Sequence, residues 1–561
     1  MSQIQEKMTN YRWVICAMLF LATTVNYMDR QVLSLTWKDF IAFDFHWTDA
    51  DYGNITAFFS IFYAIVSLFA GKFIDWMGTK KGYIWAIVIW SLGACLHAAC
   101  GLVTMNILNI GSHEELQAIQ AGTKLALSIS TISVWLFIAC RSILAIGEAG
   151  NFPAAIKVTA EYFPKKDRAL ATSIFNAGAS IGALVAPLTI PVLANAMGWE
   201  MAFIIIGGVG FIWAILWAIL YNKPTESSHV NEAELNYILQ DNTEQENINK
   251  KEESLIDSLA NKLLGEKISF SEHPVIIATP LLLSAIFSVI LFFLLDVFIF
   301  PLYALYISLA LFIIIDILLL CSINAKKGSW RYSTLKLFLL ISLCLKYRQT
   351  WAFIVGKFFT DGVWWFFLFW APAYFSELGR STKTFEGQML IFTLYLIVTI
   401  ISIYGGYLPK LFVEKRGMNP YAGRMLAMLI FAFFPIFAMF AQPLSGISPW
   451  IPAIIIGLAG AGHQSWSANL YSTIGDMFPK SAIASITGIG TMFGGMCSYL
   501  INKYSGMLFR YAEGQGDAFQ FFGETGKPAG YMIVFCYCAV AYLIAWALMK
   551  LLVPKYKPIT E

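Results

Sequence analysis

The chain has 561 residues, of which 58% are hydrophobic and only 13% are charged, and its mean hydropathy is +0.65. This composition excludes a soluble globular protein and indicates an all-α polytopic membrane protein. The formal net charge of +3 gives no indication of nucleic-acid binding, because the basic residues lie in loops between apolar runs.

Apolar runs of membrane-spanning length recur along the whole chain. The first run follows Arg12, is too long for a signal peptide and lacks a small-residue cleavage site, so we expect it to be retained. The runs predict about 14 spans, which can also be grouped as twelve and an inserted pair. The predicted spans are 12–36, 51–74, 82–104, 125–152, 168–197, 199–222, 275–300, 301–323, 350–376, 385–413, 421–441, 450–475, 481–509 and 528–553.

Basic residues in the short loops predict the orientation of these spans. The loops at 72–81 and 157–168 are rich in lysine, whereas the loop at 37–50 has one lysine and three aspartates. We therefore expect both termini in the cytoplasm and the spans in the inner (plasma) membrane. The loop at 326–348 has six basic residues and no acid, so the inserted pair must leave and return on the same side.

Composition divides the chain into four parts. A segment rich in Glu, Asn and Lys, with few aromatic residues, predicts a solvated cytoplasmic linker. The predicted parts are a six-helix bundle at 1–222, the linker at 223–274, the inserted pair with its basic loop at 275–349, and a second six-helix bundle at 350–561.

The two predicted bundles share short sequence repeats. Glu161–Lys165 is similar to Asp476–Lys480, and Ala70–Lys81 is similar to Gly405–Gly417. The two spacings, 335 and 315 residues, differ by 20, which matches a long external segment around Gly101 to Lys124 that the second half lacks. Parallel six-helix repeats with a binding site between them are the layout of major facilitator transporters.

The loop after the second span has the composition of a conformational latch. Glycine allows helices to approach closely, an aspartate can lie at a neighbouring helix N-terminus, and lysines hold the loop at an anionic membrane face. The alternative, a loop that only sets orientation, remains open. The candidate latch residues are Gly71, Asp75, Gly78, Lys80 and Lys81.

The fourth predicted span carries Arg141 and Glu148 inside an apolar run. Seven residues place them on one helical face about 10 Å apart along the axis, too far apart to pair with each other. Charges in a membrane span indicate a functional site, so each needs a partner on another helix or on a ligand. A purely structural ion pair between helices is the alternative.

The first span carries the adjacent charges Asp29 and Arg30, with Asn26 and Tyr27 one turn earlier. Adjacent residues diverge by about 100°, so these two charges cannot face one partner. We expect this polar sector to face a cavity and to meet the fourth span. The alternative is that Asp29 merely neutralises Arg30 near the outer interface.

The four charges Asp29, Arg30, Arg141 and Glu148 form a balanced set. Arginine stays charged and can bind a carboxylate through two hydrogen bonds, and a carboxylate in a low-dielectric cavity can take up a proton. Protonation of Asp29 or Glu148 would release an arginine for an anionic substrate. The set therefore predicts coupling of protons to an anion.

The seventh core span carries Lys357 and Asp361, which are spaced to pair with each other. Trp364 and Trp365 follow and can supply flat faces for the C–H groups of a sugar, although interfacial anchoring explains tryptophans equally well. The tenth core span carries His463, Gln464 and Asn469 at cavity depth. Their amides suit a polyhydroxy ligand, or else bond between helices, and His463 is a weaker candidate for proton binding.

Several parts of the sequence together resemble a known family. They are Asn26–Arg30, Gly71–Lys81, Arg141–Pro153, Trp199–Phe203, Thr360–Trp370 and Gly405–Pro409. They resemble the anion:cation symporter family of the major facilitator superfamily, and most closely the bacterial hexuronate transporters. The resemblance covers nearly the whole chain except about 225–345. It implies that Asp29 and Glu148 are proton-coupling carboxylates and that Arg30 and Arg141 bind substrate.

Two positions depart from the pattern of the related galactonate transporter. Its fifth span has a ligand-binding glutamine where this chain has Ala179, with Asn176 nearby as the candidate substitute. Its eleventh span has an asparagine that falls near Thr491 and Met492 here. Both departures argue against a galactonate-like substrate.

The sequence therefore predicts a monomeric secondary transporter for proton-coupled uptake of a sugar acid such as glucuronate or galacturonate. Alternatives are an exchanger or symporter of another organic anion, such as an aldonate or organophosphate, and a non-transporting nutrient sensor. We expect no enzymatic activity, cofactor or metal, because no nucleophile–base pair or ligand cluster is visible. The nine cysteines show no disulfide framework.

Overall fold

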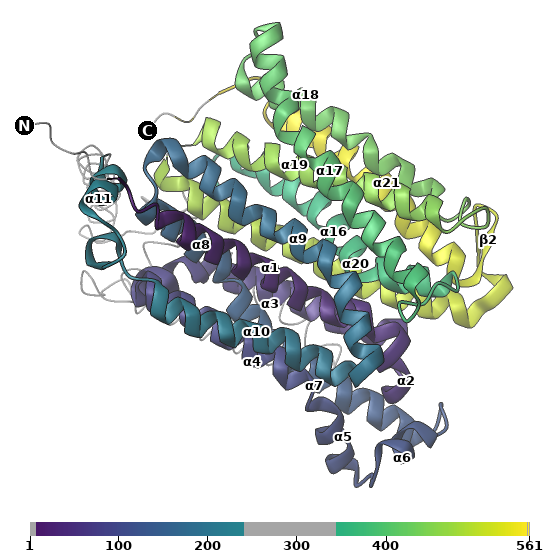
Figure 1. Cartoon of the computed structure of the whole chain (residues 1–561). Coiled ribbons are helices and arrows are strands. Elements are labelled where there is room, and N and C mark those ends of the chain that lie inside the picture. The colour runs from purple at the N-terminus through teal and green to yellow at the C-terminus, as the bar shows by residue number, and fades with distance from the viewer. Residues whose placement is uncertain (1–6, 241–343, 479, 558, 560–561) are drawn as a thin grey trace, which may run out of the picture. The chain divides into compact units, whose positions relative to one another are not determined.

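The computed structural model describes residues 7–240, 344–478, 480–557 and 559 (Figure 1). Two compact units contain them. Among the described residues, the first unit comprises 7–240, 354–473 and 490–551, and the second comprises 344–353, 474–478, 480–489, 552–557 and 559. The predicted helix pair at 275–323 lies outside the described residues.

Helices form the N-terminal half almost completely. They are α1 (Arg12–Thr36), a π-helix (Trp37–Ile41), α2 (Ala42–Phe45), α3 (Asp49–Met77), α4 (Thr79–His97), α5 (Cys100–Leu108), α6 (His113–Ala118), α7 (Lys124–Glu148), α8 (Asn151–Tyr162), α9 (Lys165–Met197), α10 (Trp199–Leu220), a 3₁₀ turn (Pro224–Glu226) and α11 (Glu232–Leu239).

The C-terminal half is also helical, with one short hairpin. Its elements are α16 (Arg348–Glu377), α17 (Phe385–Arg416), α18 (Pro420–Ala432), a 3₁₀ helix (Phe434–Phe440), α19 (Trp450–Met477), α20 (Lys480–Gln515), a 3₁₀ turn (Gly516–Ala518), β1 (Gln520–Phe521), β2 (Glu524–Thr525) and α21 (Gly526–Leu552).

Twelve of the predicted spans fall on these helices, which confirms a polytopic helical membrane protein. Within the described ranges, eight helices are long and apolar enough to cross a membrane, or nine if α4 and α5, which are bent by 49°, count as one. α1, α19 and α20 are not among them, and α1 and α19 carry the charged and amide residues of the candidate site. The fourth predicted span continues past residue 152 through α8.

Close helix contacts position α7 within the N-terminal half. A Cβ on Gly147 of α7 would overlap the backbone of Ala86 and Trp90 on α4, so only glycine permits this approach. Farther along α10, Trp213, Trp217 and Tyr221 stack in sequence with centroid distances of 4.9 and 4.4 Å. The Gly147 contact places α7, which carries Arg141 and Glu148, directly against α4.

We call the end of the helices that carries α2 the α2 end, and the end that carries α11 the α11 end (Figure 1). At the α2 end, Asp39 accepts hydrogen bonds from the Ser376 hydroxyl at 2.8 Å and from the Thr382 backbone at 2.7 Å. The Tyr52 hydroxyl donates to the Phe369 carbonyl at 2.8 Å. These bonds join the N-terminal half to the C-terminal half and hold the α2 end closed.

Residues 223–240 of the predicted linker are mostly exposed or half-buried, and α11 within them packs against the start of α1. Glu234 of α11 is fully buried and accepts hydrogen bonds from the Thr9 hydroxyl, from the backbone N–H of Tyr11 at 2.9 Å and from that of Arg12 at 3.2 Å. The Arg12 guanidinium also binds it at 2.9 Å. A carboxylate therefore caps the start of α1, where free N–H groups favour negative charge.

In the second unit, the C-terminal segment runs along helix ends. The Gln349 amide donates to the Lys557 carbonyl at 2.9 Å, and the Tyr556 hydroxyl donates to the Asp476 carbonyl at 3.1 Å. The Ile559 backbone N–H donates to the Met477 carbonyl at 2.8 Å.

Candidate functional site

The structure brings Arg30 of α1 against Glu148 of α7. Arg30 Nε donates to Glu148 Oε2 at 2.9 Å and Nη2 donates to the same oxygen at 2.6 Å. Both residues are buried, with exposed fractions of 4% and 0%. Breaking such a buried pair strands a charge at a cost of about 3–5 kcal/mol, so the pair is strongly held unless another charge replaces one partner.

Four aromatic rings surround the Arg30 guanidinium. Its Cζ lies 5.2 Å from the Tyr27 ring centroid, 5.8 Å from Phe59, 4.8 Å from Tyr63 and 4.9 Å from Trp365. These distances suit cation–π attraction. Trp365 belongs to α16, so both halves of the chain build this aromatic cage. The cage is the geometric centre of the candidate site.

Arg141 lies beside the cage, and some of its N–H donors have no hydrogen-bond partner among the described residues. Its Nη2 donates to the Arg30 carbonyl at 3.3 Å, and its Cζ lies 5.1 Å from the Phe59 ring centroid. Within the described part of the chain, its buried Nε and Nη1 atoms have no hydrogen-bond partner. Buried donors without partners cost free energy, so this guanidinium is suited to receive an anion.

The Asp29 side chain lies in different surroundings from the Arg30 side chain. It is buried next to Trp90 of α4 and within electrostatic reach of Glu148 and Arg141. Its two carboxylate oxygens have no hydrogen-bond partner among the residues that the structure describes, and neither does the amide of Asn26. The polar sector of α1 therefore divides, because only Arg30 and Tyr27 reach the cage while Asp29 lies inside the N-terminal half.

The predicted site residues of α16 and α19 have distinct surroundings. Trp364 stacks on His463 with centroids 5.2 Å apart, and His463 Nδ1 lies 2.8 Å from the Tyr542 hydroxyl. Gln464 is half-buried. Asn469 uses its amide N–H groups on the carbonyls of Gly405 and Ser465, both at 2.8 Å. This bonding makes Asn469 a clamp between α17 and α19 in this conformation.

Asn176 of α9 is exposed and away from α1. Gly178, two residues on, is the position that packs against the α1 backbone, and two residues correspond to about 200° around a helix. Ala179 is half-buried. The structure therefore does not bring Asn176 to the Arg30 cage through the α1 contact.

The predicted latch residues form separate contacts at the α11 end. Asp75 pairs with Lys157 at 2.7 Å, and Lys80 Nζ donates to the Asn222 side chain at 3.0 Å. Gly78 joins α3 to α4 with φ +76°, a conformation that requires glycine. A Cβ at Gly71 would meet open space in the described structure, so the close helix approach expected there is absent from this conformation. Lys81 is exposed.

The predicted pair of Lys357 and Asp361 forms, with Nζ and Oδ2 2.6 Å apart. Lys357 Nζ also lies 3.0 Å from the Tyr471 hydroxyl, to which it donates. Tyr471 was not among the predicted site residues, although it ends the polar run of the tenth core span, about two turns after Gln464 on the same helix.

Two further groups escaped the sequence analysis. Phe59 and Tyr63 complete the cage, and their spacing of four residues on an aromatic-rich helix was the available signal. At the α2 end, Lys527 binds Asp49 at 2.6 Å and Glu377 at 2.5 Å, while Lys38 binds Glu377 at 2.6 Å. We call these four residues the α2-end charge cluster. Charges at span ends are common, so their sequence positions alone do not mark them.

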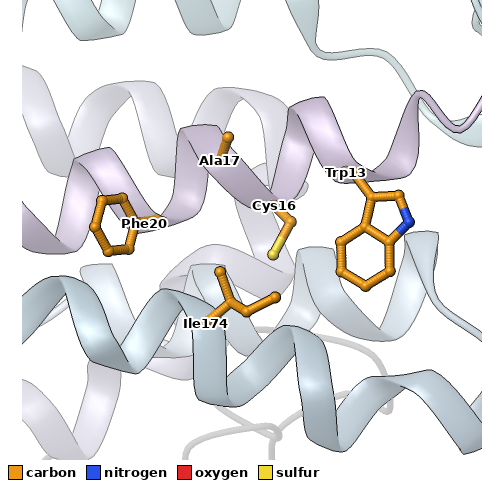
Figure 2. A pocket seen from close by; sticks show the side chains of 5 residues that line it. All are labelled: Trp13, Cys16, Ala17, Phe20 and Ile174. Carbon is orange, nitrogen blue, oxygen red and sulfur yellow. The ribbon is translucent and has the colours of Figure 1, made fainter.

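An apolar groove lies apart from these charges (Figure 2). Its volume is about 270 Å³, and it lies between α1 and α9. Trp13, Cys16, Ala17, Phe20 and Ile174 line it and offer no charged group. Within the described ranges, no group of three or more His, Cys, Asp or Glu side chains is placed to hold a metal ion.

A family model described as "Major Facilitator Superfamily" matches residues 19–500. The hexuronate transporter of Escherichia coli K12 is 23% identical over 506 residues, covering 90% of this chain and 89% of that protein. The probable galactarate/D-glucarate transporter GudP of Bacillus subtilis is 30% identical over 234 residues, covering 42% of this chain and 46% of that protein. A solved D-xylose–proton symporter superposes with a TM-score of 0.56 at 15% identity, covering 96% of this chain and 97% of that one.

Proposed function

Because this chain belongs to the Major Facilitator Superfamily and is a sugar-acid transporter by its relatives, we propose that it takes up a hexuronate, such as glucuronate or galacturonate, with protons. One observation carries the proposal. The Arg30–Glu148 ion pair lies buried in an aromatic cage to which both halves contribute, next to Arg141 with unused donors.

The proposed coupling is an exchange of partners. With Glu148 charged, Arg30 is neutralised at 2.6 Å and has little attraction for an anion. A proton on Glu148 removes that negative charge, so Arg30 and Arg141 together can bind a substrate carboxylate through charge-assisted hydrogen bonds. Asp29 lies within electrostatic reach of Glu148 and Arg141 and is the second proposed proton site.

Alternating access needs two ends that close in turn. We propose that the α11 end faces the cytoplasm, with both termini there, because the lysine-rich loops lie at that end. The closed α2 end then makes this conformation inward-facing. Gly71, Asp75, Gly78, Lys80 and Lys81 are proposed to latch the α11 end in the opposite state, and the protein is proposed to act as a monomer.

An organophosphate or aldonate substrate is the second candidate. A phosphate would need more uncompensated cations than a carboxylate, and Lys357 is neutralised by Asp361 at 2.6 Å. That pairing favours a monocarboxylate over a phosphate ester.

Purified protein in liposomes tests the proposal through one pair of assays. Counterflow measures substrate exchange, and uptake driven by a pH gradient measures coupling. We expect Glu148→Gln, which mimics the protonated acid, to retain counterflow of glucuronate or galacturonate and to lose accumulation on the pH gradient. Arg141→Ala should lose both, because the substrate carboxylate loses a charged donor.

Two outcomes count against the proposal. Wild-type protein that exchanges neither hexuronate would remove the substrate assignment. Accumulation by Glu148→Gln at the wild-type level would remove Glu148 from coupling and leave Asp29 as the remaining candidate.

A further inference from the structure

We infer that Lys357, Asp361 and Tyr471 form a second subsite, which takes the uncharged, hydroxyl-bearing end of a sugar acid and rejects a second carboxylate. We call these three residues the α16 subsite. The inference rests on the proposed function and adds to it the residue that decides between monocarboxylates and dicarboxylates.

The α16 subsite is a compact, charge-neutral group. The Lys357–Asp361 distance is 2.6 Å, and both residues are about 5% exposed. The Tyr471 ring centroid lies 4.8 Å from Lys357 Nζ, and its hydroxyl accepts a hydrogen bond from that nitrogen. Tyr471 is 37% exposed, so it is the most accessible member of the subsite.

The subsite and the Arg30 cage share α16. Lys357 precedes the cage residue Trp365 by eight residues, which corresponds to about 12 Å along a helix. Tyr471 also lies near Tyr27, which belongs to the cage on the other half of the chain. A hexuronate whose carboxylate binds at the Arg30 cage can span this distance to the α16 subsite, because a hydrogen bond at each end adds to the length of the sugar.

Packing holds the Asp361 carboxylate in place. A Cβ on Gly494 of α20 would overlap Asp361 Oδ2, so the carboxylate occupies the room that glycine leaves. A side chain at position 494 would therefore displace this carboxylate and disturb its pairing with Lys357.

The charge balance predicts the selectivity. The far end of a glucuronate or galacturonate carries hydroxyl groups, which can donate to Asp361 and accept from Tyr471 without upsetting the pair. The far end of a galactarate or glucarate carries a second carboxylate, which would meet the negative charge of Asp361. Without Asp361, Lys357 would be an unpaired buried cation that attracts this carboxylate.

The test compares galactarate with glucuronate as competitors of glucuronate counterflow in liposomes. The measured quantity is the ratio of the two half-inhibitory concentrations. We expect wild type to prefer glucuronate and Asp361→Asn to shift the ratio toward galactarate by at least about tenfold, since truncating one partner of a buried pair exposes the other charge. The double variant K357M/D361N removes both charges and should return the ratio to near the wild-type value.

A second test variant and a control variant complete the experiment. Gly494→Ala displaces the Asp361 carboxylate without removing it and should shift the ratio in the same direction, which keeps the test available if Asp361→Asn folds poorly. Glu414→Gln is the matched control, because it removes the acid of an exposed lysine–glutamate pair of the same spacing, 3.7 Å from Lys410. It should leave the ratio unchanged.

Failure of this inference is distinguishable from failure of the proposed function. Wild type that exchanges glucuronate but accepts galactarate equally well, or an unchanged ratio in both folded Asp361→Asn and Gly494→Ala, overturns the α16 subsite and leaves hexuronate transport standing. Wild type that exchanges neither ligand overturns both.

Discussion

Removal of the Lys527 ammonium should open the α2 end of the protein. Lys527 is 7% exposed and binds Asp49 of the N-terminal half at 2.6 Å and Glu377 of the C-terminal half at 2.5 Å. In Lys527→Met, the side chain keeps its apolar stem but loses its charge. The two carboxylates then remain close together in the closed state, whereas opening of the α2 end hydrates them.

The magnitude follows from what remains of the α2-end charge cluster. Breaking a buried ion pair costs about 3–5 kcal/mol when it strands a charge. Lys38 still binds Glu377 at 2.6 Å and lies 3.7 Å from Asp49, and it is partly exposed, so it offsets part of this cost. We therefore expect the closed state to lose about 2–3 kcal/mol, which shifts the ratio of open to closed protein by about 30- to 160-fold.

Distance measurements between spin labels can follow this shift. Phe43 of α2 and Phe385 of α17 are 67% and 73% exposed and belong to different halves, so cysteines placed there report the separation at the α2 end. In a background free of native cysteines, Lys527→Met should populate a longer distance. Arg380→Met is the control, because Arg380 pairs at 2.8 Å with Glu386 of the same half.

An unchanged distance distribution in a folded Lys527→Met variant would refute the reasoning. It would mean that the hydrogen bonds of Asp39 and Tyr52 hold the α2 end without help from the cluster. An equal shift in the Arg380→Met control would show that loss of any nearby cation has the same effect.

Two further predictions concern stability. Burial raises the pKa of Glu234, but hydrogen bonds from the start of α1 outweigh burial and hold the pKa below its usual 4.5. The charged form of Glu234 therefore stabilises the fold above pH 4.5, and this contribution is lost as the pH falls below that value. Glu234→Gln should lower the melting temperature at neutral pH. The difference in melting temperature between the variant and wild type should become smaller in acid. Gly147→Ala should destabilise the protein by about 1–3 kcal/mol, because its Cβ would overlap the α4 backbone at Trp90. Gly208→Ala, which meets open space, should be neutral, and equal melting temperatures for the two variants would contradict the packing argument.

Local composition was enough to predict the twelve helices of both halves. Apolar runs of about twenty residues must be helical in a bilayer, because each backbone N–H and C=O group needs an internal partner. Composition also identifies Asp29, Arg30, Arg141 and Glu148 as candidate functional residues, because charges inside apolar runs are energetically costly. The spacing of four residues between Lys357 and Asp361 likewise predicts their pairing, since both lie on one helix.

Contacts between distant segments could not be predicted in this way. Sequence spacing shows that Arg141 and Glu148 are too far apart to pair, but not that Glu148 binds Arg30 while Arg141 binds a carbonyl. The same holds for Asn469, whose amide suits a ligand by composition but is used between α17 and α19. A side chain's partner depends on which helices pack together, and helical periodicity does not predict which helices these are.

The sequence by itself determined the class of protein, the helices and the charges that require an explanation, because these depend on local hydropathy and on spacing along one helix. Only the tertiary structure decided that Trp365 closes the cage around Arg30 and that Lys527 joins Asp49 to Glu377. Each of these contacts joins residues more than a hundred positions apart. Their energies arise only after helices from the two halves have packed and excluded water, because a charge gains from a distant partner only where solvent no longer screens it.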